Sequence, residues 1–170
     1  MAIRESINAH PKSTIGVVSG VIVVIVAFGL YSARTPQLSL PTQAYFSDDD
    51  GKTFFVDSVT KVAPFDRGGR QVVAAHVFQY GDGKLFVGYV ERAISAEAKA
   101  AVERDRAEIA AIIVAHPTAG PDGELVTRVK KNLEVKRPGD TTWVGAESSK
   151  AIAIYQTIWT GSGTPTEVNP

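Results

Sequence analysis

The strongest constraint on this chain is an uncharged stretch near its N-terminus. Between Lys12 and Arg34 no residue carries a charge, and most of the 21 residues from Ser13 to Ala33 are Ile, Val, Gly, Ala, Phe or Leu. A helix of that length reaches roughly 30 Å, which matches the hydrocarbon thickness of a bilayer. Because such a run has no polar face to offer water, it excludes a surface helix of a soluble protein. We therefore predict a transmembrane helix over 13–33, preceded by a short N-terminal segment, 1–12.

The same stretch leaves a cleaved signal peptide open as an alternative. Cleavage after Ala33 would place the bulky Tyr31 at a position where signal peptidase requires a small residue, and this favours a retained anchor. Arg4 and Lys12 precede the stretch and only Arg34 follows it closely, so the positive-inside rule indicates a cytoplasmic N-terminus. We expect a single-pass protein of the cell membrane whose C-terminal domain is extracytoplasmic.

Two glycines give the predicted membrane helix a possible packing face. Gly16 and Gly20 are four positions apart, and small residues at that spacing let two helices approach closely. A helix-mediated dimer is one interpretation; the other is a face that contacts only lipid. The lipid bilayer is the first expected partner in either case.

Composition shifts divide the rest of the chain. Residues 34–42 contain Pro36 and Pro41 and are typical of an extended linker. Residues 161–170 are mostly Gly, Ser, Thr and Pro, which predicts a disordered tail. One folded domain is therefore expected over 43–160.

The overall charge and the absence of cysteine exclude several function classes. The 18 basic side chains balance 18 acidic ones, so no electrostatic footprint for nucleic acid is present. With no cysteine, disulfides, thiolate metal sites, iron–sulfur clusters and thiol nucleophiles are excluded together. No motif indicates a cofactor.

Three turn signals predict β-hairpins inside the domain. Asp50-Gly51 lies between Ala44–Ser47 and Thr53–Val56, and this register places Phe46 opposite Phe55. Asp82-Gly83 joins Val72–Tyr80 to Leu85–Arg92. Counting outward from that turn places Phe78 opposite Val87 and His76 opposite Tyr89. Pro138-Gly139 marks the third turn, between Leu133–Arg137 and Thr141–Val144. Val72–Phe78 is apolar or small on both faces except at His76, which is typical of a central strand.

One long helix follows the second hairpin. Ser95 is a candidate N-cap and Pro117 stops the helix. Its second half, Ile109 to Val114, is expected to be the more deeply docked part. A shorter helix is expected over Lys150 to Thr157, capped by Ser149. Hairpins with one long helix predict an α+β domain with a mainly antiparallel sheet.

The acidic run before Gly51 is the most distinctive local motif. Ser47 to Phe54 reads Ser-Asp-Asp-Asp-Gly-Lys-Thr-Phe and resembles the Asp-box, S-x-D-x-G-x-T-F/W, a β-hairpin motif of sialidase-like propellers and several other folds. The resemblance implies a tight turn in which a carboxylate accepts backbone N–H groups. It implies no catalysis, because Asp-boxes lie away from the active sites of those enzymes, and a propeller would need repeated copies. A loose divalent-ion site through Asp48, Asp49 and Asp50 is an alternative interpretation.

A second candidate site is a group of basic residues late in the domain. Five of them fall within ten positions: Arg128, Lys130, Lys131, Lys136 and Arg137. Such a patch would bind an acidic partner, a glycan or a lipid headgroup. The alternative is a solvated edge strand, on which lysines discourage pairing with another sheet.

Taken together, one predicted span, a linker, the Asp-box-like hairpin and the string from Val135 to Val144 (VKRPGDTTWV) resemble uncharacterised small bacterial membrane-anchored proteins. The resemblance implies an architecture and no activity. We expect a membrane-tethered, non-enzymatic binding module or an accessory subunit of a membrane complex, with a protein partner. The alternative is a small extracytoplasmic hydrolase or metal-dependent enzyme that uses the Asp48–Asp50 turn and His76; a histidine buried in the core is the plainer interpretation of His76.

Overall fold

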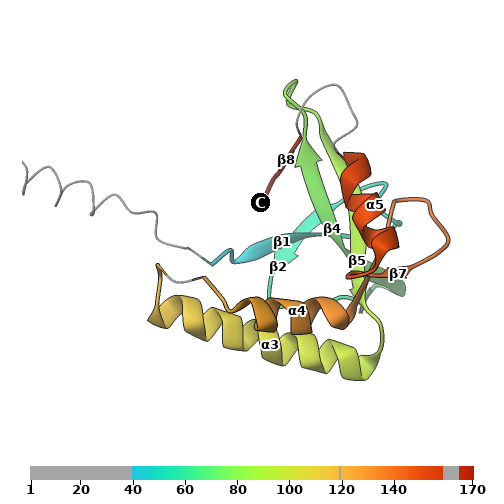
Figure 1. Cartoon of the computed structure of the whole chain (residues 1–170). Helices are drawn as coiled ribbons and strands as arrows, with labels where there is room; N and C mark the ends of the chain where they lie inside the picture. The colour runs from blue at the N-terminus through green and yellow to red at the C-terminus, as the bar shows by residue number, and fades with distance from the viewer. Residues whose placement is uncertain (1–39, 119, 159–164) are drawn as a thin grey trace, which may run out of the picture. The chain divides into compact units, whose positions relative to one another are not determined.

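The computed structural model describes residues 40–118, 120–158 and 165–170 (Figure 1). These residues confirm the α+β class with a mainly antiparallel sheet. The elements in chain order are β1 (Gln43–Ser47), β2 (Phe55–Ser58), β3 (Phe65–Arg67), β4 (Arg70–Gln79), β5 (Leu85–Ala93), α3 (Ala96–Ala115), α4 (Gly123–Lys131), β6 (Leu133–Lys136), β7 (Val144–Gly145), α5 (Ser149–Ile158) and β8 (Thr166–Glu167).

The predicted membrane helix over 13–33, with Gly16 and Gly20, lies outside the described residues. Within the described ranges, no helix combines the length and the apolar character needed to cross a bilayer.

The long strand β4 organises the sheet, whose order is β2-β1-β4-β5-β6-β7. Short strands pair with β4 at successive positions: β3 at Arg70–Val72, β1 at Val73–Ala74 and β8 at Phe78–Gln79. The expected central strand is confirmed, since β4 lies between β1 and β5. β1 pairs with β2 in the predicted register, with Phe46 opposite Phe55.

The β4–β5 hairpin departs from the predicted register at one point. His76 faces Tyr89 as predicted, but Phe78 faces Phe86 rather than Val87, because the register shifts between His76 and Val77. The shift leaves Gly88 as the extra residue of a β-bulge. A Cβ at Gly88 would lie 2.7 Å from the ring of Phe78, so the close approach of that ring requires glycine.

Helix α3 begins and ends where the sequence predicts, and the hydroxyl of its N-cap Ser95 accepts the N–H of Ala98. The prediction that its second half is the more deeply docked was wrong. Its buried residues, Ala98, Val102 and Asp105, all lie in the first half. Ala98 and Val102 join the main core between the helices and one face of the sheet, with Leu133, Val135, Ala146 and Ile154 among its members.

The remaining helices complete this layer. Figure 1 shows α3 and α4 side by side, with α5 against β5. Helix α4 was not predicted; the carboxylate of Asp122 caps it by accepting the N–H of Glu124. Helix α5 was predicted, although the hydroxyl that accepts at its start belongs to Ser148 rather than Ser149.

The C-terminal residues 165–170 differ from the disordered tail that the sequence predicts. Thr166 and Glu167 form β8 and pair with Gln79 and Phe78 of β4. The N–H of Val168 also donates to the carbonyl of Val77. This end of the chain is therefore part of the sheet, and it brings Glu167 next to His76.

Candidate functional site

The first element of the site is a histidine held between two carboxylates. His76 stacks on Tyr89 across the β4–β5 ladder, with ring centroids 4.1 Å apart and planes 13° apart. Its Nδ1 lies 2.7 Å from Oε1 of Glu167, and its Nε2 lies 3.8 Å from Oε2 of Glu91. Three strands, β4, β5 and β8, therefore contribute to this contact.

The two carboxylates keep the imidazole charged. Burial alone would lower the pKa of His76, but hydrogen bonds to Glu167 and Glu91, together with their charges, outweigh it and raise the pKa to about 9. Burial acts to raise the pKa of Glu91, and His76, Arg106 and Lys130 outweigh it, so that this pKa is lowered. At neutral pH, His76 is therefore protonated and cationic, and Glu91 is an anion.

A cavity of about 420 Å³ opens beside this group, between the sheet and the three helices. We call it the mixed cavity, because one side is charged and the other apolar. Its ionisable lining consists of His76, Tyr89, Glu91, Arg106, Lys130 and Tyr155. Its apolar lining consists of Ile109, Val126, Val129, Leu133 and Ala146. The hydroxyl of Tyr155 donates to the carbonyl of Ala146, 3.2 Å away.

A second cavity of about 560 Å³, the apolar cavity, lies between α3 and the start of the sheet. Leu40, Pro41, Val59, Val62, Ala107 and Ala110 supply most of its apolar wall. Arg106 and Ile109 line both cavities, so the two are neighbours at one turn of α3. We refer to the two cavities together as the α3 hollow. It lies along α3 from Glu103 to Ala110. Ile109 is partly buried there; Ile112 and Ile113, further along the helix, are also partly buried, and Val114 is 72% exposed.

The Asp-box-like turn has the geometry that the resemblance implies. The buried hydroxyl of Ser47 accepts the N–H of Gly51 at 2.7 Å and donates to Asp49. The carboxylate of Asp49 accepts the N–H of Thr53 at 2.9 Å and its hydroxyl at 2.7 Å. The N–H of Thr53 is the main reason that the pKa of Asp49 is lowered, against a smaller opposing effect of desolvation. Asp50 and Gly51 both have positive φ, at 65° and 80°.

The three carboxylates of this turn do not converge on a common point. Asp48 lies 3.8 Å from Arg67, and Asp49 is occupied within the turn. Asp50 pairs with Lys136 at 2.6 Å and accepts the N–H of Gly139. In the part of the chain that the structure describes, no group of three or more His, Cys, Asp or Glu side chains could hold a metal ion. The structure therefore offers no set of ligands that would support the predicted metal site at Asp48, Asp49 and Asp50.

The turn and His76 lie on opposite faces of the sheet. Side chains alternate along β5, so Tyr89 and Glu91 point to the helical side while Arg92 points away from it. Asp50 and Arg92 line a separate hollow of about 350 Å³, on which Trp143 also borders. The structure therefore does not bring together the two groups that the hydrolase alternative combines.

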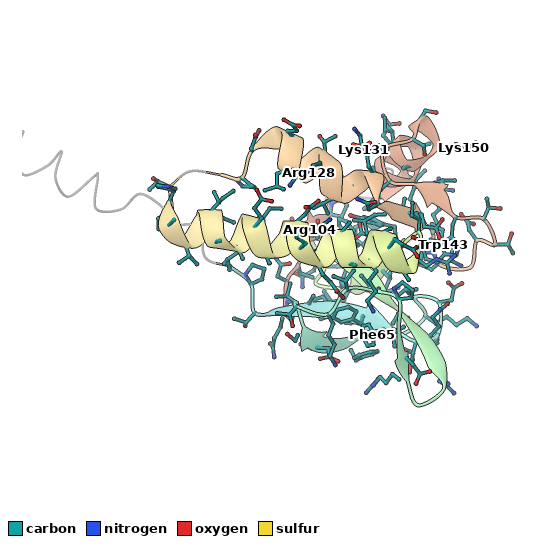
Figure 2. All side chains as sticks on the ribbon, turned by 90° about the horizontal axis from the view of Figure 1, so that it is seen from below. Phe65, Arg104, Arg128, Lys131, Trp143 and Lys150 are labelled. Carbon is teal, nitrogen blue, oxygen red and sulfur yellow. The ribbon has the colours of Figure 1, made fainter. Side chains whose placement is uncertain are left out.

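The five basic residues are divided between two elements. Arg128, Lys130 and Lys131 belong to α4, whereas Lys136 ends β6 and Arg137 follows it. Arg128 pairs with Asp105 at 3.2 Å and with Glu108 at 2.9 Å, on the outer groove between α3 and α4. Figure 2 shows Arg104, Arg128 and Lys131 along these two helices. Lys136 is buried against Asp50, and the buried Nε of Arg137 has no hydrogen-bond partner among the described residues.

Sequence reasoning identified His76 and Lys130 but missed Glu91, Arg106 and Glu167. A signal existed for Glu91, because a charged residue that alternates with Tyr89 on the core face of a strand needs a buried partner. None existed for Glu167, which lies in a segment whose composition indicates disorder.

Comparisons with known proteins leave the geometry as the only guide to function. No protein-family model matches the chain, and the searches of curated proteins and of solved structures found no match.

Proposed function

We propose that this protein is a membrane-tethered binding module without catalytic activity of its own, and that its binding surface is the α3 hollow. The uncharged stretch over 13–33 would supply the tether, with the domain on the extracytoplasmic side. Leu40, which lines the apolar cavity, follows the end of that stretch by seven positions in the sequence. The tether would therefore hold the hollow close to the membrane.

The observation that carries this proposal is the unfilled space along an apolar helix face. Ile109, Ile112 and Ile113 recur at helical spacing, as they do on faces that pack against something. The described residues leave all three partly buried, and Ile109 lines both cavities, of about 560 and 420 Å³. Ligand sites in proteins are mostly apolar clefts of about 300–1,000 Å³ with a few polar groups, and both cavities fall within that range.

The electrostatics of His76 argue against a general-base role for this side chain. A general base must have lost its proton at the working pH. The carboxylates of Glu91 and Glu167 instead keep the imidazole protonated by raising its pKa to about 9. The ion pair also ties β8 to β4 and β5, which is a structural task.

The test is to fill the hollow and ask whether its occupant is lost. Ala110 lines the apolar cavity, whereas its neighbour Ala111 is exposed. We would compare full-length wild type, A110W and A111W, each purified from native membranes, by native mass spectrometry with the tether intact. The wild type and A111W should carry a bound molecule or a stoichiometric partner that A110W has lost, with equal thermal stability in all three. If A110W carries the same bound species as the wild type, the hollow is not the binding surface. If the purified wild type turns over a substrate and A110W does so equally, the protein is an enzyme and the proposal is wrong.

A further inference from the structure

We propose that the α3 hollow binds a single-chain amphiphile with an anionic head group, such as a fatty acid or a lysolipid phosphate. The head group would lie in the mixed cavity near Arg106 and Lys130, and the chain would extend past Ile109 into the apolar cavity. This inference rests on the proposed function and specifies the chemical class of the ligand.

The charges of the mixed cavity favour an anion. His76, Arg106 and Lys130 face the single carboxylate of Glu91, and Glu167 occupies the far side of the imidazole. Even when Glu167 is counted, the cavity carries more positive than negative charge. An anion entering this space is attracted, and a cation is repelled.

Two of these cations keep unused donors. Nη2 of Arg106 lies 3.4 Å from Oε1 of Glu91, longer than the 2.7–2.9 Å of a well-formed bond between charged groups. Arg106 has four further N–H donors by its chemistry. Lys130 has no carboxylate within 4.0 Å among the described residues, although its charge contributes to lowering the pKa of Glu91. A carboxylate or phosphate between Arg106 and Lys130 would therefore gain donors without displacing the pair between His76 and Glu167.

The adjoining cavity fits the apolar part of such a ligand. Its wall is largely aliphatic, from Leu40, Val59, Val62 and Ala110. Arg106 and Ile109 line both cavities, so a head group held at Arg106 would lie next to the apolar cavity, and its chain would reach the apolar wall by passing these two side chains. Burying an alkyl chain there is favourable in proportion to the apolar area removed from water.

A ligand with a cationic head group and an apolar protein helix both fit the α3 hollow less well. A cationic head group in the mixed cavity would face Arg106 and Lys130, and the carboxylate of Glu103, which has no ion pair among the described residues, lines the apolar cavity instead. An apolar protein helix would fill the apolar cavity but leave the two cations in the mixed cavity without a partner, which is unfavourable for charges that lose water. A membrane that carries the tether would supply the anionic amphiphile directly.

The experiment uses the full-length protein in its native membranes and three photoreactive probes. All three carry the same twelve-carbon chain with a diazirine, and they differ only in their head group: carboxylate, hydroxyl or trimethylammonium. Labelled peptides are quantified by mass spectrometry, and labelling outside the α3 hollow corrects for the amount of each probe in the membrane. The variants are K130Q and R106Q. The matched control is K131Q, which removes the same charge from the next position of α4, on the outer groove that Arg104 and Arg128 share.

We expect the carboxylate probe to label peptides within 40–62 and 106–113 several-fold more than the hydroxyl probe, and the trimethylammonium probe to label them least. K130Q and R106Q should each lower labelling by the carboxylate probe about tenfold, the effect of losing one charged hydrogen bond of about 1.4 kcal/mol. The same variants should leave labelling by the hydroxyl probe unchanged, and K131Q should leave all three probes unchanged.

The outcomes that contradict the inference are distinct from those that contradict the proposed function. If the three head groups label equally, or if K130Q and R106Q leave the carboxylate probe unaffected, the head-group assignment is wrong. If A110W still abolishes labelling in that case, the hollow remains the binding surface and only the ligand class has failed. If A110W leaves labelling unchanged, the proposed function itself has failed. Labelling of the hollow by none of the three probes would overturn the amphiphile.

Discussion

The ion pair of His76 makes the stability of the domain depend on pH in a defined direction. The unfolded chain binds this proton with the ordinary histidine pKa of about 6.5, and the folded domain binds it with a pKa of about 9. Because the folded pKa is the higher one, the stabilisation is complete below about pH 6.5 and is lost as the pH rises through 9.

The magnitude follows from the difference between the two values. A factor of ten in proton affinity corresponds to about 1.4 kcal/mol, so a rise from 6.5 to about 9 gives about 3 kcal/mol. Glu167 is 48% exposed and its contribution is screened by water, whereas His76 itself is 26% exposed. We therefore expect about 2 kcal/mol of stabilisation below pH 6.5 and almost none at pH 10.

The substitution His76→Gln isolates this contribution. Urea unfolding of the full-length protein in a nonionic detergent, followed by tryptophan fluorescence from pH 6 to 10, gives the free energy of unfolding for wild type and H76Q. Titrations common to both proteins cancel in the difference between them, and the lost stacking on Tyr89 adds a part that does not vary with pH. The difference should shrink by about 2 kcal/mol between pH 6 and 10, with most of the change between about pH 6.5 and 9. E167Q should show a smaller part of the same effect. If the difference in unfolding free energy between wild type and H76Q stays constant over this range, the charged contact of His76 with Glu91 and Glu167 is refuted.

Two further predictions concern packing, each with a matched control. Gly88→Ala should destabilise the domain by about 1–3 kcal/mol, because the new methyl group would lie 2.7 Å from the ring of Phe78. Gly145→Ala is the control: no atom lies within 4 Å of its Cβ, so its effect on thermal denaturation should be close to neutral. Val102→Ala should lower the free energy of unfolding in urea by about 1–2 kcal/mol, because Val102 is fully buried. Val114→Ala should lower it by less than about 0.5 kcal/mol, because Val114 is 72% exposed. Equal losses would mean that α3 docks along its whole length.

Local chemistry made the hairpins predictable. Asp50-Gly51 adopts the positive φ values that a tight turn demands, and the pairing of Phe46 with Phe55 follows from counting outward. The same counting failed beyond Asp82-Gly83, because a bulge at Gly88 moves the ladder by one residue. What places the bulge is the ring of Phe78, a contact across the strands that the local sequence does not encode.

The candidate site was predictable only where its residues carried a local signal. His76 stood out as the one polar residue in an apolar strand, but its strongest partner, Glu167, lies 91 positions later in the chain. Helix α4 shows the converse case. Its acidic first turn and basic last turn suit the helix dipole. The density of basic residues from Arg128 onward is equally typical of a charged surface patch, so the charges alone do not predict a helix.

Helix α3 shows why the apolar pattern of a helix indicates a need for cover and not what provides it. From the sequence, the second half of α3, Ile109 to Val114, is expected to be its more deeply docked part. The helix begins three residues after β5 ends, so its first turns are held against the sheet by Ala98 and Val102. A helix of 20 residues is about 30 Å long, and its far end is carried past the part of the sheet that packs against its start. Ile109 then borders two cavities, with Arg106 and Lys130 supplying charge at one end. This isoleucine, which the sequence pattern places in the core, is therefore in our proposal a residue that the ligand covers.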